Sequence, residues 1–331
     1  MTHEPVRWGL MGTARIATVR VLPVLPQVPD ATLLAVASRS MEKARRIADQ
    51  FGAPRAYDSY EALLADPDIE VVYIPLPNHL HKEWAIKAVQ AGKHVLCEKP
   101  IALNAAEARE MQAAARANGR LLLEAFMYRF GPLMQKALEI VRSGVLGDLR
   151  AIHTAFDYVI VENPANVRLH PEMGGGALYD IGAYCINVAR MLAGREPVTA
   201  FAHLERSPKW GVDMSATGVL DFGDGLLGTF SASFDCRGST FFRAVGTRGV
   251  LEAPEGFLGR GESARLMLTL EDRSHETVIP LVDAYALELQ DMCDAVRGVR
   301  PAQFADEPLD ATIRVIDACF ASERSGRPER I

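Results

Sequence analysis

Lys99 is a residue whose type and position could do chemistry. It stands in Glu98-Lys99-Pro100, directly after the apolar run 94–97, which predicts a buried strand. Ligands bind at the carboxyl ends of parallel strands in open α/β sheets, so a lysine there can direct its ammonium group at a ligand. Pro100 fixes the turn and can form a cis peptide bond. A solvated surface lysine is the alternative interpretation, and these residues alone leave both open.

A row of polar side chains follows the glycine run 174–176. Asp180, Tyr184 and Asn187 are separated by four and three residues, which places them on one face of a helix. The neighbouring apolar stripe consists of Ile181, Cys185, Val188 and Leu192. Packing alone explains such a polar row poorly, although a tyrosine hydrogen-bonded at a domain boundary is the simpler alternative.

A glycine turn near the start of the chain resembles a phosphate-binding loop. The residues that follow the predicted strand 7–11 are Gly12, Thr13, Ala14, Arg15, Ile16 and Ala17, a variant of the fingerprint Gly-x-Gly-x-x-Gly/Ala with alanine at its second glycine. An ordinary glycine turn is the alternative. The place of the loop between a strand and a helix favours nucleotide binding, because the amino end of a helix suits an anion.

The end of the second predicted strand, 32–37, bears on the choice of cofactor. An NAD-binding protein places an acidic residue about twenty residues after the loop, where it binds the ribose hydroxyls. Here Ser38 and Arg39 occupy this place, and no acid does. A hydroxyl and a forked guanidinium suit the 2′-phosphate of NADP, so we expect NADP, with NAD as a second possibility. A solvated Arg39 is the alternative.

The third predicted strand, 70–75, is followed by a further segment, 75–81, that should lie at the same edge of the sheet. We expect cofactor contacts here and after the next strand, from Pro75, Leu76, Asn78, His81, Glu98 and Lys99. His81 begins a predicted helix, and a histidine in that place is more often a capping or packing residue than a catalyst.

The elements that position these residues change in character along the chain. Short apolar runs alternate with helical patterns over the first 125 residues, which predicts βαβ units and a doubly wound parallel sheet. From about 148 onward the pattern has a period of two, with hairpins such as 218–234, and predicts a large, open, mostly antiparallel sheet with flanking helices. We therefore expect a dinucleotide-binding domain over 1–125 and a substrate-binding and oligomerisation domain over 126–331.

Composition excludes several classes of protein. The net charge of −6 and the absence of a long basic block argue against a nucleic-acid partner. The five cysteines are scattered, so we expect buried, reduced thiols and no metal site. We also expect no membrane partner and a cytoplasmic location, because neither a signal peptide nor a long apolar stretch occurs.

Together the motifs resemble the Gfo/Idh/MocA oxidoreductases. The resemblance rests on the Gly12 loop and on four segments in the same order: 75–81, 92–100, 124–130 and 174–184. It is closer to the branch of glucose-fructose oxidoreductase, dimeric dihydrodiol dehydrogenase and NADP-dependent xylose dehydrogenase than to inositol dehydrogenase. The latter has a histidine at the place of Tyr184, so a histidine-based proton relay is not expected here.

The resemblance implies a mechanism for a small polyhydroxylated substrate, such as an aldose or a vicinal diol. A hydride passes between the nicotinamide and the substrate carbon, while Tyr184 exchanges the hydroxyl proton with the help of Lys99. Asp180 holds the lysine or a substrate hydroxyl. Tyr128, Arg129 and Arg168 are further substrate-binding candidates, and either arginine could instead form an ion pair at the domain interface.

The resemblance leaves two alternative functions open and also implies an oligomeric state. A relative of glycosidase type that retains NAD, and a non-catalytic cofactor-binding sensor, are the two competing functions. We expect a homodimer or homotetramer that forms through the open face of the C-terminal sheet.

Overall fold

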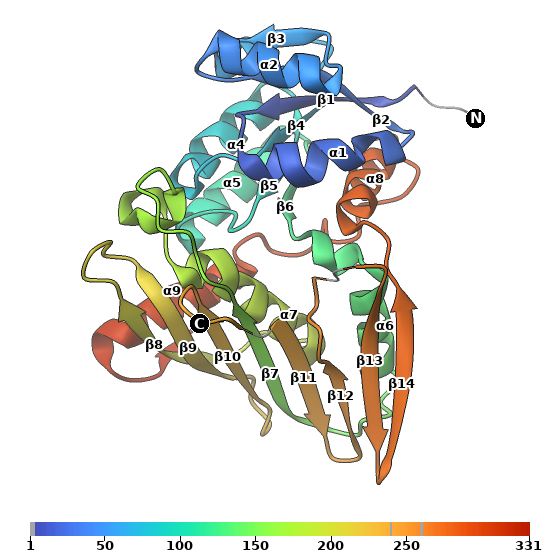
Figure 1. Cartoon of the computed structure of the whole chain (residues 1–331), viewed down its shortest axis with the longest axis vertical. Helices are drawn as coiled ribbons and strands as arrows, with labels where there is room; N and C mark the ends of the chain where they lie inside the picture. Colours follow the sequence, from blue (N-terminus) through green and yellow to red (C-terminus); the bar gives the residue numbers. More distant parts are fainter. Residues whose placement is uncertain (1–3, 239, 259–260) are drawn as a thin grey trace. The chain divides into compact units, whose positions relative to one another are not determined.

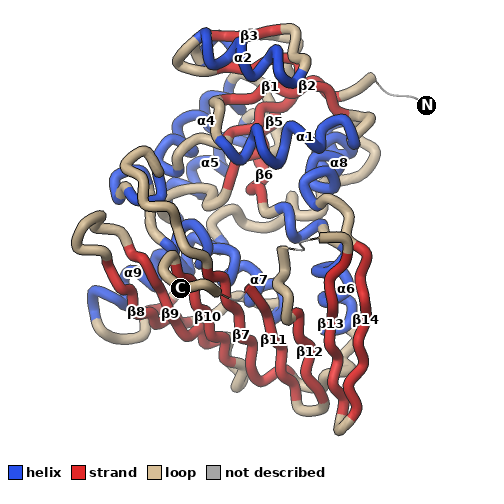
Figure 2. Tube along the Cα trace, viewed as in Figure 1, coloured by secondary structure: helices blue, strands red, loops and turns tan. Residues whose placement is uncertain are grey.

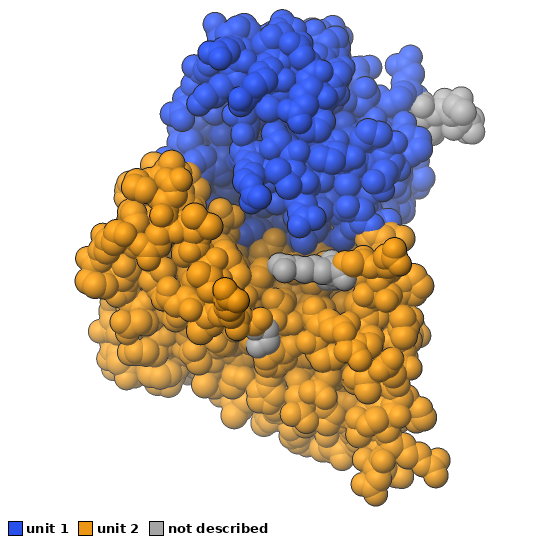
Figure 3. All heavy atoms as spheres, in the orientation of Figure 1, with its two compact units in different colours: residues 1–127, 283–310 blue, residues 128–282, 311–331 orange. Residues whose placement is uncertain are grey.

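The computed structural model describes residues 4–238, 240–258 and 261–331, which form two compact units. The first unit contains residues 1–127 and 283–310, and the second contains 128–282 and 311–331 (Figure 3). The segment 283–310 therefore belongs to the first unit, whereas the sequence analysis placed it in the C-terminal domain.

The first unit is built on a six-stranded parallel sheet with the order β3-β2-β1-β4-β5-β6 (Figure 1). This is the doubly wound order: from β1 the chain proceeds first toward one edge of the sheet and then, from β4, toward the other, and ligands bind at the point where this order reverses. The strands are β1 (Val6–Met11), β2 (Ala31–Ala37), β3 (Arg55–Tyr57), β4 (Val71–Ile74), β5 (His94–Glu98) and β6 (Leu122–Ala125). Its helices are α1 (Leu22–Val24), α2 (Met41–Phe51), α3 (Tyr60–Ala65), α4 (His81–Gln90), α5 (Ala105–Ala117) and α8 (Ala284–Val296). The expected parallel sheet is confirmed.

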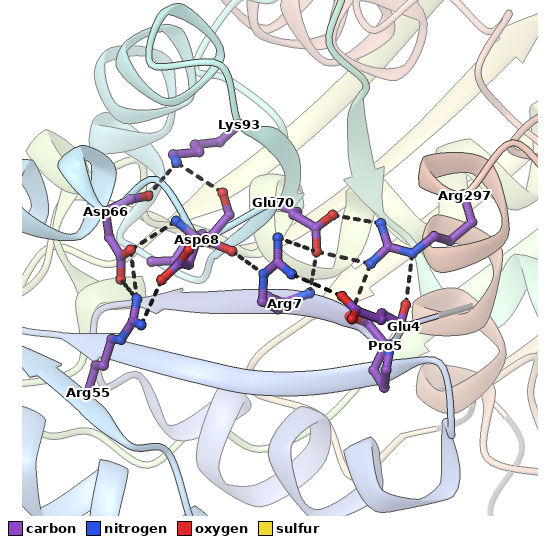
Figure 4. Close-up of polar contacts among 10 residues, drawn as sticks. Glu4, Pro5, Arg7, Arg55, Asp66, Asp68, Glu70, Lys93 and Arg297 are labelled. Atoms are coloured by element: carbon purple, nitrogen blue, oxygen red, sulfur yellow. Dashed lines mark hydrogen bonds and ion pairs between the residues drawn. The ribbon is translucent and has the colours of Figure 1, made fainter. Parts of the chain in front are cut away.

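Helix α8 joins the first unit because its apolar face completes that unit's core. Leu289, Met292 and Cys293 are buried in one cluster with residues of β1 and β2. Just after the helix, Arg297 donates two hydrogen bonds to the Glu70 carboxylate, over 2.6 and 3.0 Å (Figure 4). Helical periodicity identifies an apolar face but not the core that receives it, so the sequence pattern could not assign this helix.

The second unit contains a nine-stranded sheet with the order β14-β13-β12-β11-β7-β10-β9-β8-β15 (Figure 2). The pair β7 and β10 is parallel, and the other neighbouring strands in this order are antiparallel. The strands are β7 (Leu149–Asp157), β8 (Thr199–Arg206), β9 (Asp213–Asp221), β10 (Leu227–Ser233), β11 (Thr240–Gly246), β12 (Gly249–Ala253), β13 (Ser263–Leu270), β14 (Arg273–Pro280) and β15 (Glu329–Arg330). The expected, mostly antiparallel sheet is confirmed.

Helices pack on this sheet and carry part of the candidate site. They are α6 (Pro132–Arg142), α7 (Ala183–Ala193) and α9 (Ala311–Ser325), and a π-helical turn, η7 (Leu178–Gly182), leads directly into α7. Helix α7 contacts β7 and β10, and α9 contacts β8. The predicted apolar stripe of α7 is buried.

The structure bears on two expectations, that the cysteines are buried and that no helix spans a membrane. Cys97, Cys185, Cys293 and Cys319 are buried free thiols, but Cys236 is exposed, so the expectation that all five are buried is wrong. Cys236 lies just beyond β10, in a turn that no apolar pattern covers. Within the described residues, no helix is both long and apolar enough to cross a bilayer.

Candidate active site

Gly12 makes the tight turn between β1 and the following helix. Its φ is +97°, a value that side chains rarely adopt, and its N–H donates to the Ala37 carbonyl over 2.8 Å. A Cβ at Gly12 would lie 2.8 Å from Cδ2 of Leu76, so the turn has no room for one. The loop then continues through half-buried Thr13 and Ala14, exposed Arg15 and half-buried Ile16. These features fit a loop whose backbone must approach a nucleotide closely.

The end of β2 places an exposed arginine near this turn. Arg39 is exposed, whereas Ser38 is 7% exposed and its Oγ accepts the Ser40 N–H over 3.4 Å. Burial raises the pKa of Tyr60, and the nearby positive charge of Arg39 opposes this shift. The Tyr60 hydroxyl lies 3.7 Å from where a Cβ of Gly12 would stand. Gly12 and Arg39 thus both lie near Tyr60.

The turn that carries Lys99 is held by hydrogen bonds on each side. Glu98 accepts the Tyr73 hydroxyl over 2.7 Å, and its other carboxylate oxygen accepts the Lys99 N–H over 3.3 Å. The Lys99–Pro100 peptide is cis. Beyond the proline, the Ile101 N–H donates to Glu124 over 2.9 Å. Lys99 therefore projects from a braced backbone at the carboxyl end of β5.

His81 connects two segments of the same sheet edge. Its imidazole is fully buried, with Nδ1 at 2.9 Å from the Pro100 carbonyl and Nε2 at 2.8 Å from the Leu76 carbonyl. Burial lowers the pKa of His81 to about 4, and the charge of Lys99 adds to this shift. A neutral imidazole has one N–H and can donate to only one of these two carbonyls, so His81 connects residues 76 and 100 chiefly as a buried packing residue. Nearby, Pro75 is buried, and Asn78 begins a short helical turn, 78–80.

In the second unit, the glycine run 174–176 forms backbone hydrogen bonds that hold the preceding loop, 168–170, next to the start of η7. Gly176 donates its N–H to the Arg168 carbonyl over 2.9 Å, and Gly175 donates to the His170 carbonyl over 3.0 Å. A Cβ on Gly175 would lie 2.5 Å from the Arg168 carbonyl oxygen. Gly174 and Gly176 both have positive φ. The glycines therefore fix the position of Arg168 relative to the helix.

Asp180 gathers a polar cluster on this helix. Its Oδ2 accepts the Arg168 Nε–H over 2.7 Å and the Tyr158 hydroxyl over 3.0 Å. The Asp180 charge is the main cause that raises the pKa of Arg168, and Tyr158 and Tyr184 contribute in the same direction. Burial, followed by the Asp180 charge, raises the pKa of Tyr158. The Arg168 side chain remains 44% exposed.

Tyr184 is held in an aromatic environment beside the cluster. Its side chain is 8% exposed, and its ring centroid lies 5.6 Å from that of Phe156 and 5.7 Å from that of Tyr128. Phe257 stacks at 6.3 Å. These rings fix the tyrosine side chain and exclude water from most of it.

Asn187 lies at the centre of a buried network with two of the substrate-binding candidates. Its Oδ1 accepts bonds from the Tyr128 hydroxyl and, over 2.9 Å, from Arg129 Nε, while its amide donates to Thr312 over 2.9 Å. Tyr128 and Arg129 are 1% and 4% exposed. The structure therefore groups Tyr128 and Arg129 with Asn187, and groups Arg168 with Asp180.

Several residues of these clusters were not among the predicted site residues. Tyr158 ends the alternating run 152–158, a pattern that indicates a strand and says nothing of a partner for its hydroxyl. Tyr73, Glu124 and Asp213 are likewise joined to the site only by contacts distant in sequence. In the described part of the chain, no three His, Cys, Asp or Glu side chains gather as a metal site would need.

Comparison with known protein families matches both parts of the chain. The model described as "Oxidoreductase family, NAD-binding Rossmann fold" matches residues 6–126, and "GFO/IDH/MocA C-terminal domain" matches 134–252. The chain belongs to the Gfo/Idh/MocA oxidoreductase family. Members of this family are NAD(P)-dependent oxidoreductases, and the resemblance noted from the motifs is confirmed.

Three relatives of this family span most or nearly all of the chain. D-xylose 1-dehydrogenase (NADP(+)) 2 of Haloferax volcanii is 34% identical over 96% of this chain and 98% of its own. Trans-1,2-dihydrobenzene-1,2-diol dehydrogenase of Mus musculus is 34% identical over 78% of each chain. The crystal structure of aldose-aldose oxidoreductase from Caulobacter crescentus, complexed with glycerol, has a TM-score of 0.92 at 27% identity and covers 99% of this chain and 100% of its own.

Proposed function

We propose that this chain is an NADP-dependent dehydrogenase that oxidises a neutral sugar or vicinal diol, or reduces the corresponding carbonyl. The proposal rests chiefly on the Asp180 cluster beside Tyr184, because it brings the hydroxyl and guanidinium groups of the 158–173 loop to a carboxylate on the helix that carries Tyr184. Names of the relatives support it, since they include an NADP(+)-linked xylose dehydrogenase and a diol dehydrogenase.

The choice of NADP is supported by the groups at the end of β2. Arg39 is exposed near Gly12, and no acidic side chain stands at the ribose-binding place. We infer that Arg39 binds the 2′-phosphate and that Ser38 supports it, while the Gly12 loop, residues 75–78 and Glu98-Lys99 hold the rest of the cofactor. When bound, the nicotinamide supplies the hydride acceptor or donor.

In this proposal Tyr184 carries the proton. A free tyrosine titrates near pH 10, so it needs a positive charge nearby to accept a proton around neutrality. Lys99 is our candidate for that charge. Asp180 orients the substrate hydroxyl and fixes Arg168.

The charge of the cluster favours a neutral substrate over an anionic one. Asp180 already pairs with Arg168, and the other members, Tyr158 and Tyr184, are uncharged when protonated. A cluster of donors and acceptors without excess charge suits several hydroxyl groups, because each hydroxyl can both donate and accept a hydrogen bond, whereas an apolar substrate can do neither. An anionic sugar would have to compete with Asp180 for Arg168.

Quaternary structure is the remaining part of the proposal. An outward-facing row crosses the sheet of the second unit through paired Phe201, Val219, Thr229 and His153. Phe201 and Val219 are 38% and 41% exposed. We propose that this face mediates a homodimer or homotetramer. Light scattering tests this by comparing the molar mass of the unmodified chain with that of Phe201→Glu, which should be smaller.

Substitution of Tyr184 and Lys99 tests the function. We expect Tyr184→Phe and Lys99→Met each to lower turnover by roughly two to four orders of magnitude, while Tyr184→Phe still binds NADP in a fluorescence titration. Tyr179→Phe, on the same helix but outside the Asp180 cluster, is the matched control. Near-normal turnover of Tyr184→Phe would remove Tyr184 as proton carrier. NADP binding without turnover of any sugar or diol would favour the sensor, and NAD retained through purification would favour the glycosidase-type relative.

A further inference from the structure

Asp213 is a buried carboxyl group at the amino end of the helix that carries Asp180 and Tyr184. It begins β9 and is 1% exposed. Its Oδ2 accepts the Leu178 N–H over 2.6 Å, so it satisfies one of the amide groups that a first helical turn leaves without a partner. A carboxylate is also the side chain that the positive end of a helix dipole favours.

The other carboxylate oxygen of Asp213 fits against the glycine run. A Cβ at Gly176 would overlap Oδ1 of Asp213, and the φ of Gly176 is +113°. The same glycine donates its N–H to the Arg168 carbonyl. One carboxyl group thus contacts both the first turn of η7 and the glycine that positions the Arg168 loop.

Two charged groups from neighbouring elements face Asp213. Arg206 lies opposite it in the pairing of β8 with β9, and Glu323 comes from α9. Arg206 donates two hydrogen bonds to Glu323, over 2.9 and 2.7 Å. On η7 itself, the Asp180 charge is paired with Arg168. Because Arg206 is already paired with Glu323, it compensates the Asp213 charge only in part.

We propose that Asp213 is a positioning residue, whose ionised carboxylate fixes the first turn of the helix and with it Asp180 and Tyr184. This inference rests on the function proposed above for those two residues. The charged form is the effective one, because a carboxylate accepts an N–H bond more strongly than a neutral carboxyl group.

Ionisation of Asp213 has opposite effects on the helix start and on the whole fold. Burial raises the pKa of Asp213 to about 7, above the ordinary value of 3.8. Between these two values the folded state binds more protons than the unfolded state, so the free energy of unfolding falls as pH rises. Across the same change the amino end of the helix becomes better ordered. A residue kept only for stability would not show these opposite trends.

Amide hydrogen exchange over residues 174–184 tests the inference without a substrate. After correction for intrinsic rates, we expect this segment of the unmodified chain to exchange more slowly at about pH 8.5 than at about pH 6, on the order of fivefold. Asp213→Asn should remove this difference while its stability at the higher pH is equal or greater. Asp221→Asn, at the other end of β9, is the matched control because its carboxylate caps only the hairpin turn through Gly223.

Two results would overturn the inference. One is unchanged exchange of 174–184 in both Asp213→Asn and Asp213→Ala. The other is faster exchange spread evenly over the second unit, which would indicate ordinary loss of stability. A supporting result is a local change in exchange, together with a lower kcat for D-xylose oxidation and an unchanged dissociation constant for NADP. If ionised Asp213 positions Tyr184, kcat of the unmodified chain should rise with pH near 7, and Asp213→Asn should lack this rise.

Tyr184→Phe separates this inference from the proposed function. Its turnover should fall while its exchange over 174–184 matches the unmodified chain. If Tyr184→Phe remains active, the proposed function fails, and the exchange data still report on Asp213. If Tyr184→Phe is inactive but Asp213→Asn is normal in exchange and turnover, only the role of Asp213 fails.

Discussion

Nε of Arg168 donates to Oδ2 of Asp180 over 2.7 Å, and the two opposite charges form one ion pair in the second unit. The pair joins a loop, 158–173, to the helix that carries Tyr184. Because the guanidinium group is planar, this bond also restricts the orientations that its other two nitrogens can adopt. The pair therefore bears directly on which substrates the cluster accepts.

Arg168→Ala is expected to lower kcat/KM for neutral aldoses by about tenfold or more, because it leaves the Asp180 carboxylate without its cation. Arg168→Lys should restore the activity only in part, since an ammonium group lacks the planar fork. Steady-state rates with D-xylose and D-glucose, beside their phosphates and uronates, check this. Activity restricted to the anionic sugars, and lost in Arg168→Ala, would reverse our preference for a neutral substrate.

Arg39→Ala should weaken NADP binding selectively. A charge-assisted hydrogen bond contributes on the order of 1.5–3 kcal/mol, so the dissociation constant of NADP should rise by about tenfold to a hundredfold. The affinity for NAD should change little, because NAD lacks the 2′-phosphate. Fluorescence titration of both cofactors checks this, with Arg116→Ala, an exposed arginine on α5, as the control. Equal affinities for NAD and NADP in the unmodified chain would contradict the prediction.

Gly175→Ala tests whether the close contact between the glycine run 174–176 and the Arg168 loop positions the site. The new Cβ would lie 2.5 Å from the Arg168 carbonyl oxygen and 2.8 Å from that of His170, and these backbone groups must move. We expect about 1–3 kcal/mol of lost stability and a fall in kcat of at least about tenfold. Gly194→Ala is the control: at the other end of α7, its Cβ meets nothing within 4 Å, although its φ is +64°. Equal activity of the two variants would show that this close contact does not position the site.

The lowered pKa of His81 predicts that the chain loses stability in acid. Its pKa is lowered to about 4 in the folded chain, below the 6.5 of a free imidazole, so the unfolded chain binds more protons between these values. The free energy of unfolding should therefore fall as pH drops from about 6.5 to about 4, by up to about 3 kcal/mol from this residue. Urea denaturation of the unmodified chain and of His81→Gln checks this, and the variant should show a weaker pH dependence. The same slope in both proteins would contradict the assignment.

Local patterns were sufficient for much of the fold and for part of the candidate site. Helix α2 illustrates this, because its ends depend on nearby residues: Ser40 caps the first turn through the Lys43 N–H, and Gly52 ends the helix with a φ of +74°. Gly12 could also be singled out, since strand, turn and helix follow each other directly. Such features depend on residues within a few positions of one another.

Contacts between distant segments could not be predicted in the same way. The partners of Asp180, Tyr158 and Arg168, both come from the 158–173 loop, and Asp213 reaches Leu178 from 35 positions along the chain. The assignment of α8 to the first unit likewise depends on which core accepts its apolar face. Neither periodicity nor residue type carries this information.

NADPH absorbance during incubation with a panel of aldoses, polyols and dihydrodiols tests the central claim most directly. We predict NADP-dependent oxidation of at least one neutral member, at a rate that exceeds the NAD-dependent rate and that Tyr184→Phe lowers by roughly two to four orders of magnitude. Absence of any cofactor reduction across the panel, with NADP bound at saturating concentration, would contradict the account.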